Sequence, residues 1–270
     1  MAIYDCFQYF NEDHMIDLRM NILNDHVDFF VISESTKTHQ GEDKKLNFKI
    51  ENFKKYKKKI IYLIADYLEE ENLSKHLGGE SLIEQHQRNY ILKGLNKADE
   101  NDLIILSDAD EIPDLNKINQ IKPNTKFTAF SQKMFMYKLN LQNINESNWI
   151  GSKICKKKYL NIPQELRNLK FKKYPFWRID KWNLQTINGG WHFSFLQSPN
   201  DISKKIKSYS HGEFNIKENI DIEKINQKII DNVDIFDRGH KLTKVNVDDS
   251  FPETGKHKYK KRLKYILTFR

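Results

Sequence analysis

The chain has 270 residues, 45 Lys and Arg against 37 Asp and Glu, a formal net charge of +8, and 39% hydrophobic residues. That length fits one large domain, and the apolar content excludes a globally disordered chain. No apolar run approaches the roughly 18 residues of a membrane span, and the N-terminus lacks the features of a signal peptide. With only 2 cysteines there is no disulfide framework and no cysteine-rich zinc site, so we expect a cytoplasmic protein.

The first 110 residues alternate between strand-like and helix-like patterns. β-Branched and aromatic residues predict strands near Ile3 and over residues 27–32, 59–64 and 102–106. Apolar residues at helical spacing predict helices around residues 15–22 and over 81–98. This alternation predicts an α/β fold with a mainly parallel central sheet flanked by helices.

The second half has a different texture. Residues 127–141 predict a long strand or hairpin, whereas 153–176 are basic and show no clear period. An aromatic strand follows Gly189-Gly190, and helices are predicted after Ser198 and over 221–232. Because no Gly/Ser/Pro-rich linker divides the chain, we expect one domain over residues 1–240 and a basic extension over 241–270.

The segment from Ser107 to Pro113 carries the strongest chemical signal. It follows the apolar strand 103–106, and open α/β sheets bind ligands at the carboxyl ends of such strands. In an extended backbone, Asp108 and Asp110 would point to the same side. They could then bind one divalent cation, Mn²⁺ or Mg²⁺, leaving coordination positions for phosphate oxygens; a simple acidic turn is the alternative.

A second polar segment, residues 32–41, ends another predicted strand. Its Glu34, Ser35, Thr38 and Gly41 suit ribose hydroxyls and an aromatic base, and Lys44-Lys45, in particular Lys45, could bind phosphate. A polar turn with capping hydroxyls would show the same composition.

Together these segments resemble glycosyltransferase family 17, the relatives of β-1,4-mannosyl-glycoprotein β-1,4-N-acetylglucosaminyltransferase, over roughly residues 2–240. The matching residues are Glu34-Ser35-x-x-Thr38-x-x-Gly41, Leu46, Phe48, Arg88, Ser107 to Pro113 and Gly190-Trp191-His192-x-Ser194. The resemblance implies a GT-A type fold, a UDP-sugar donor, a divalent metal and inversion at the anomeric carbon. The membrane anchor and luminal stem of those enzymes are missing here, which favours a cytoplasmic enzyme of surface polysaccharide synthesis over one that modifies N-glycans.

The resemblance also suggests roles for single residues. His192 would complete the metal sphere or bind phosphate, although a buried structural histidine is an equal alternative. Trp191 and Phe195 would stack on acceptor sugars, unless they belong to the core. Arg88 would bind the diphosphate or pair with Glu111.

An inverting transferase needs a base for the acceptor hydroxyl. Glu213, after the predicted helix that follows His192, is the first choice, and its family counterpart is acidic as far as the pattern can be matched. Glu111, Asp180 and Asp201 are the competitors.

Two other functions remain open at this stage: a Mg²⁺-dependent phosphoryl or nucleotidyl transferase, and a non-catalytic sugar- or polyanion-binding module. No nucleic-acid motif accompanies the lysine runs. The basic and apolar segment 256–267 could form an interfacial helix on the inner face of a membrane, where a lipid-linked glycan acceptor would lie; packing on the domain is the alternative.

Overall fold

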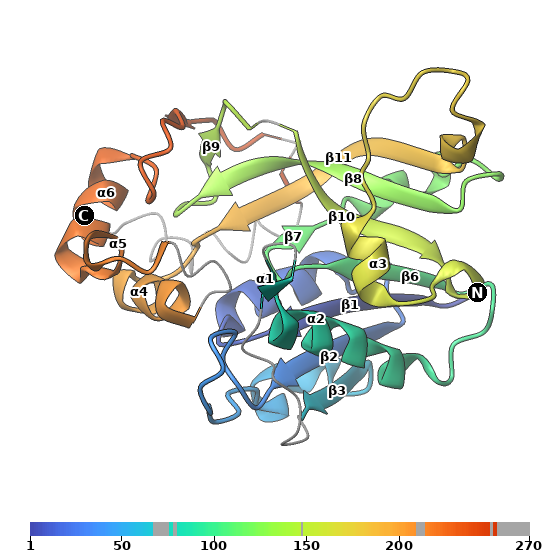
Figure 1. Ribbon diagram of the computed structural model, residues 1–270, viewed down its shortest axis with the longest axis horizontal. Coiled ribbons are helices and arrows are strands. Elements are labelled where there is room, and N and C mark those ends of the chain that lie inside the picture. Colours follow the sequence, from blue (N-terminus) through green and yellow to red (C-terminus); the bar gives the residue numbers. More distant parts are fainter. Residues whose placement is uncertain (67–75, 78–79, 147, 209–213, 249–250, 253–270) are drawn as a thin grey trace.

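A curled, mixed β-sheet organises the chain. The computed structural model describes residues 1–66, 76–77, 80–146, 148–208, 214–248 and 251–252. The main sheet has the strand order β12-β9-β8-β10-β6-β1-β2-β3, and β11 pairs with both β8 and β7 (Figure 1). The short strands β4 (His76–Leu77) and β5 (Glu80–Ser81) form a separate two-stranded sheet.

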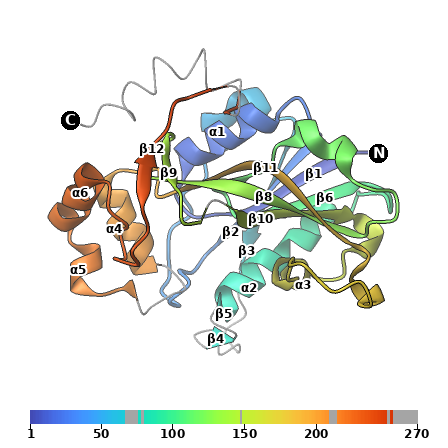
Figure 2. The ribbon, with the colours of Figure 1, turned by 90° about the horizontal axis from the view of Figure 1, so that it is seen from above.

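The first half of the sheet is parallel, as predicted from the sequence. It consists of β1 (Ile3–Tyr9), β2 (Phe29–Ser35), β3 (Ile60–Ala65) and β6 (Leu103–Ser107). The predicted helices are also present, as α1 (Asp13–Leu23) and as α2 (Leu82–Asn89) followed by a 3₁₀ turn, Tyr90–Leu95. Figure 2 shows α1 on one face of the sheet and α2 on the other.

The prediction of a mainly parallel sheet is wrong for the second half. There β10 (Trp149–Lys156) is antiparallel to β6 and to β8 (Phe127–Met136). Short links join β8 to β9 (Leu141–Asn143) and then to β10, so the chain reverses direction without the helical crossover that parallel pairing needs. The pattern of the first 110 residues therefore does not extend to the rest.

Strand β11 (Leu184–Ser194) returns to parallel pairing with β8 and runs antiparallel to the two-residue strand β7 (Glu111–Ile112). The remaining helices are α3 (Pro163–Asn168), α4 (Pro199–Ser208), α5 (Lys217–Ile220) and α6 (Ile222–Asp231). The predicted helices after Ser198 and over 221–232 correspond to α4 and α6.

Three groups of buried apolar side chains hold these layers together. Alternate residues of β1 face opposite ways: Phe7 packs with α1, whereas Cys6 packs on the side of the 3₁₀ turn and α3. The third group joins the ends of β8 and β11 to α4 and α6, where Ile202 and Ile206 are buried. This third group places α4 beside the carboxyl ends of the parallel strands.

The beginning of the predicted extension packs on the domain. Strand β12 (Leu242–Lys244) pairs antiparallel with β9, and the Phe251 ring lies 5.3 Å from that of Phe135. The segment 256–267 lies outside the described residues. Within the part of the chain that the structure describes, no helix is long and apolar enough to cross a membrane.

Candidate functional site

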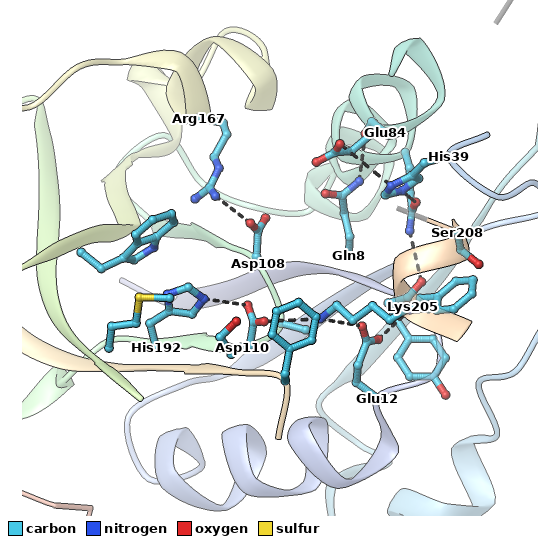
Figure 3. A pocket seen from close by; sticks show the side chains of 18 of the residues that line it. Gln8, Glu12, His39, Glu84, Asp108, Asp110, Arg167, His192, Lys205 and Ser208 are labelled. Atoms are coloured by element: carbon cyan, nitrogen blue, oxygen red, sulfur yellow. Dashed lines mark hydrogen bonds and ion pairs between the residues drawn. The ribbon is translucent and has the colours of Figure 1, made fainter. Parts of the chain in front are cut away.

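A cavity of about 290 Å³ opens at the carboxyl ends of β1 and β6. Figure 3 shows its charged side chains converging from both halves of the fold. Glu12, Glu84, Asp108 and Asp110 come from the first 112 residues, whereas Arg167, His192 and Lys205 come from α3, β11 and α4. The cavity lies at the strand ends where we expected a ligand site from the sequence.

Asp108 and Asp110 lie in a tight turn between β6 and β7, not in extended backbone. The amide of Glu111 donates to the carbonyl of Asp108 at 3.0 Å, which closes the turn. The two carboxylates therefore diverge, Asp108 toward Arg167 and Asp110 toward His192 and Lys205 (Figure 3). The backbone here is a turn and not the extended strand that the sequence suggested, because β6 ends at Ser107, but both side chains line the cavity.

Arg19 fixes the backbone of this turn through hydrogen bonds. Its fully buried guanidinium forms a bidentate pair with Asp5 at 2.6 and 2.7 Å. The same group donates to the carbonyls of Asp108 at 3.1 Å and Glu111 at 2.6 Å. Since a guanidinium offers several donors in a fixed plane, Arg19 couples α1 and β1 to the backbone of the acidic turn. It is a positioning residue that the sequence analysis did not identify.

Two guanidiniums surround the carboxylate of Asp108. Arg167 donates to it at 2.6 Å, and Arg88 lies at 3.5 Å. Burial alone would raise the pKa of Asp108, but the charges of Arg167 and Arg88 outweigh it and hold the pKa at about 2. Asp108 is therefore ionised at any physiological pH.

Arg167 also pairs with Glu111, the buried neighbour of the two aspartates. The contacts measure 2.8 and 3.1 Å, and the indole of Trp149 donates to the same carboxylate at 2.7 Å. Arg88, for which a pair with Glu111 was one expectation, instead contacts Glu84 at 2.7 Å besides Asp108. Glu111 is thus committed to ion pairing and is poorly placed to act as a base.

The position of Arg167 depends on Lys153 of β10. The Lys153 ammonium donates to the backbone carbonyls of Arg167 and Leu169, the latter at 3.0 Å, at the end of α3. Burial, together with the charge of Arg167, lowers the pKa of Lys153 to about 7. A buried lysine thus satisfies the terminal carbonyls of α3 and fixes the residue that faces Asp108.

Asp110 has a separate set of partners. Its carboxylate lies 3.7 Å from Nε2 of His192 and 3.4 Å from the ammonium of Lys205. Lys205 also lies 3.5 Å from Glu12, whose other oxygen accepts the backbone N–H groups of Phe10 and Asn11. Lys205 therefore bridges two carboxylates across the cavity.

His192 reaches the cavity because β11 bends at Gly190. That glycine has φ of 105°, and a Cβ there would lie 2.4 Å from the carbonyl of Ile112. The register of β11 shifts at this point, after which His192 stands opposite Glu111 and under the Trp149 ring, 4.7 Å between centroids. Its Nδ1 is buried without a hydrogen-bond partner among the described residues.

The expected donor segment after β2 is only partly at the cavity. Glu34 is fully buried and accepts hydrogen bonds from Lys44 at 2.6 Å, Tyr62 at 2.8 Å and the amides of Asn47 and Phe48. Glu34 thus holds its own loop together rather than facing the cavity. The neighbouring side chains Lys37, His39 and Lys44 line the cavity.

Other residues expected to bind the donor, at the end of β2 and after it, also do not line the cavity. Ser35 and Thr38 are buried, and their hydroxyls accept the amides of Lys37 and Glu42. Gly41 adopts φ of 96° in the turn that follows, and Lys45 is not among the lining residues. Their predicted contacts with a donor stay predictions.

The aromatic residues expected at the acceptor separate in the fold. Phe195 lines the cavity, with Lys205 5.9 Å from its ring centre, whereas Trp191 packs in the hydrophobic core. Trp149 lines the cavity, where we had expected Trp191. Tertiary packing determines which of the two tryptophans is buried in the core and which lines the cavity. No pattern in the sequence distinguished them for this reason.

Glu213, the expected base, lies outside the described residues. Among its competitors, Asp180 pairs with Arg178 on an exposed loop, and Asp201 accepts the Ser198 hydroxyl at the start of α4. Neither lines the cavity, whereas Glu146, which the sequence analysis did not consider, does.

The side chains at one wall of this cavity include ligand types that divalent ions accept. Asp108 and Asp110 offer hard oxygen ligands, and His192 turns an imidazole nitrogen toward Asp110. Among the described residues no three Asp, Glu, His or Cys side chains form a ready cluster. Mg²⁺ in phosphate sites is commonly held by one or two carboxylates together with substrate oxygens, so a site completed by the ligand is chemically consistent.

Comparison with known proteins gives one informative result: glycosyltransferase family 17 matches residues 1–240. Curated proteins give no match. Among solved structures, HddC from Yersinia pseudotuberculosis is similar with 13% identity and a TM-score of 0.35, covering 70% of this chain and 90% of that one. A glycosyltransferase involved in glycosylation of the major capsid of PBCV-1 shows 12% identity, a TM-score of 0.30, and coverage of 70% and 81%. These likenesses are distant, and the family match is the finding that bears on function.

Proposed function

The chain belongs to glycosyltransferase family 17, and we propose that it transfers a sugar, N-acetylglucosamine being the first candidate, from a UDP-sugar to a glycan hydroxyl with inversion. The cavity at the end of β6 carries this proposal. It combines Asp108 and Asp110 with Arg167, His192 and Lys205, a mixture of charges suited to a diphosphate and its counter-ion. The parallel strands with this acidic turn support a GT-A type arrangement.

Two cations of the cavity, Arg167 and Lys205, would bind the donor's diphosphate. Arg167 and Lys205 lie within 2.6 and 3.4 Å of the two aspartates, so phosphate oxygens entering between them would meet both. Asp108, Asp110 and His192 would hold Mn²⁺ or Mg²⁺, which when bound would offset the charge that develops on departing UDP. Lys37 and Lys44, which also line the cavity, would face the rest of the nucleotide.

The acceptor would lie against Phe195 and Trp149, aromatic rings that line the cavity near Asp110. We propose Glu213 as the base that removes the proton from the acceptor hydroxyl. Glu146, which also lines the cavity, is the alternative base among the described carboxylates. Its Oε2 is buried without a hydrogen-bond partner among the described residues. The acceptor we propose is a lipid-linked glycan of a surface polysaccharide, in a cytoplasmic setting consistent with two free buried cysteines.

Titration with UDP, in the presence and absence of Mn²⁺, tests the proposal. We expect UDP to bind at least about tenfold more tightly with Mn²⁺, and a donor screen to release UDP from one sugar nucleotide. Asp25→Asn, on an exposed turn beyond α1, is the matched control for Asp110→Asn, which should abolish the metal effect. Equal UDP affinity with and without Mn²⁺ would contradict metal dependence. Salt-sensitive binding of any polyanion without preference for UDP would instead favour a binding module.

A further inference from the structure

A loop of residues 170–182, between α3 and β11, projects from the end of the sheet (Figures 1 and 2). It carries four large apolar side chains that are largely exposed: Phe176 at 80%, Trp177 at 67%, Ile179 at 69% and Trp182 at 68%. Four exposed large apolar side chains within seven residues are uncommon on a monomeric domain, and such clusters usually mark a binding site. The cavity lies elsewhere, and none of these four side chains lines it.

The loop is held in shape by its own contacts. The indole of Trp182 donates to the carbonyl of Phe176 at 3.0 Å, and the Phe176 and Trp177 rings meet edge to face at 5.2 Å. Arg178 pairs with Asp180 at 2.7 and 2.8 Å across a 3₁₀ turn. These contacts tie the loop to itself, so the apolar side chains remain outside the core.

The same loop also carries a concentration of positive charge. Residues 170–182 include five Lys or Arg and one Asp, a net charge of +4. Three of the cations, Lys172, Arg178 and Lys181, lie 5.7 to 5.8 Å from the ring centre of Tyr174. The loop thus presents exposed aromatic and aliphatic side chains together with a cluster of basic side chains.

We propose that this loop, the 170–182 loop, binds the surface of an anionic lipid bilayer. Tryptophan and phenylalanine partition into the interfacial layer of a membrane, and nearby Lys and Arg are attracted to anionic headgroups. One projecting segment carries both exposed apolar side chains and basic side chains. The apolar side chains can enter the interface while the basic ones stay at the level of the headgroups.

Other occupants suit the loop less well. A second copy of the chain meeting it symmetrically would bring one +4 surface against another. A single-stranded nucleic acid needs a basic groove that follows its backbone, whereas residues 170–182 form a projecting loop and none of them lines the cavity. A small sugar ligand would need a concave site rather than a projecting tip.

The loop and the cavity can act at the same time. From Leu184, just after the loop, to His192 at the cavity, β11 advances by about 26 Å at roughly 3.3 Å per residue. Membrane binding through the loop therefore does not cover the acidic turn. The proposal is independent of which donor or acceptor the cavity takes.

Co-sedimentation of the full chain with vesicles tests the proposal. We expect binding to phosphatidylcholine vesicles containing phosphatidylglycerol, little binding to pure phosphatidylcholine, and a blue shift of tryptophan emission on binding. The double variant Phe176→Ser with Trp177→Ser should lower the partition coefficient at least about tenfold. Removal of two charges, Lys172→Gln with Lys173→Gln, should lower it by about 25-fold, at roughly fivefold per charge.

The matched control is Lys57→Gln with Lys58→Gln, which removes the same charge from an exposed basic run beside the buried Tyr56. This control should bind like the wild type, and all variants should keep the same UDP affinity. Unchanged vesicle binding by the Phe176 and Trp177 double variant would overturn the proposal, and loss of binding in a chain ending at Gly255 would then assign it to the C-terminal segment. A dimer that the double variant loses, or preferential binding of an oligonucleotide, would overturn it as well.

Discussion

The parallel strands of the first half and the later strands β8, β10 and β11 meet at one cavity but supply it with different groups. The first half contributes the acidic turn and fixes its backbone through Arg19. The second half contributes Arg167, His192 and Lys205, which contact the two aspartates. The acidic motif is thus complete within a local stretch of sequence, whereas the positive charges that face it come from residues that approach it only when the mixed sheet forms.

The largest expected effect comes from the acidic turn. Asp110→Asn keeps the shape of the side chain but removes the charge near His192 and Lys205, so sugar transfer should fall by about a thousandfold. UDP release from the active donor measures it, with Asp25→Asn as control. Transfer near the wild-type rate would show that the first half does not carry the chemistry.

Arg19 tests whether the first half fixes its own motif. Arg19→Gln leaves Asp5 buried without its bidentate partner, and the free energy of unfolding should fall by about 3 kcal/mol. Urea unfolding measures this change. The control is Arg178→Gln, which breaks a similar bidentate pair with Asp180 at the surface and should cost much less, because solvent screens that pair. Equal losses would contradict the role of burial.

The base should come from the second half. Glu213→Gln keeps hydrogen bonding but cannot accept the proton, so transfer should fall by about a hundredfold while UDP affinity persists. Glu146→Gln, on the link between β9 and β10, is the parallel variant. A loss confined to Glu146→Gln would move the base to that residue.

Arg167 tests the counter-charge that the second half brings to Asp108. In Arg167→Gln the charge-assisted contacts to Asp108 and Glu111 are lost, and UDP affinity should weaken by about tenfold. The pKa of Asp108 should also rise from about 2 toward its ordinary value. Calorimetric titration with UDP measures the first effect; an unchanged affinity would show that Arg167 serves structure alone.

Lys153 gives the smallest effect, in stability. Its folded-state pKa is about 7, against an ordinary value of 10.5, so between these values the unfolded chain binds more protons. The free energy of unfolding should therefore be lowest below pH 7 and should rise by about 2 kcal/mol between pH 7 and pH 9. Lys153→Met should flatten this rise in urea unfolding. Equal slopes in both proteins would refute the assignment.

The sequence predicted the local elements of both halves more successfully than their arrangement. The periodicity of Met15, Leu18 and Ile22 predicted α1, and the apolar run 103–106 predicted β6, because burial of one stripe or of both strand faces is visible in neighbouring residues. Strand direction after β6 was not visible in this way. It depends on which strands β8 and β10 meet, and the apolar pattern is the same for either direction.

Asp108-Ala109-Asp110 at a strand end, and the glycine before Trp191-His192, were determined by the sequence itself, since turn chemistry and strand ends act over a few residues. Tertiary structure alone decided that the aspartates diverge and that Arg167 reaches Asp108 from 59 residues away. It also decided that Trp149 faces the cavity while Trp177 faces solvent. The physical reason is that an ion pair or a buried ring depends on which surfaces pack together, and packing joins residues that no local pattern relates.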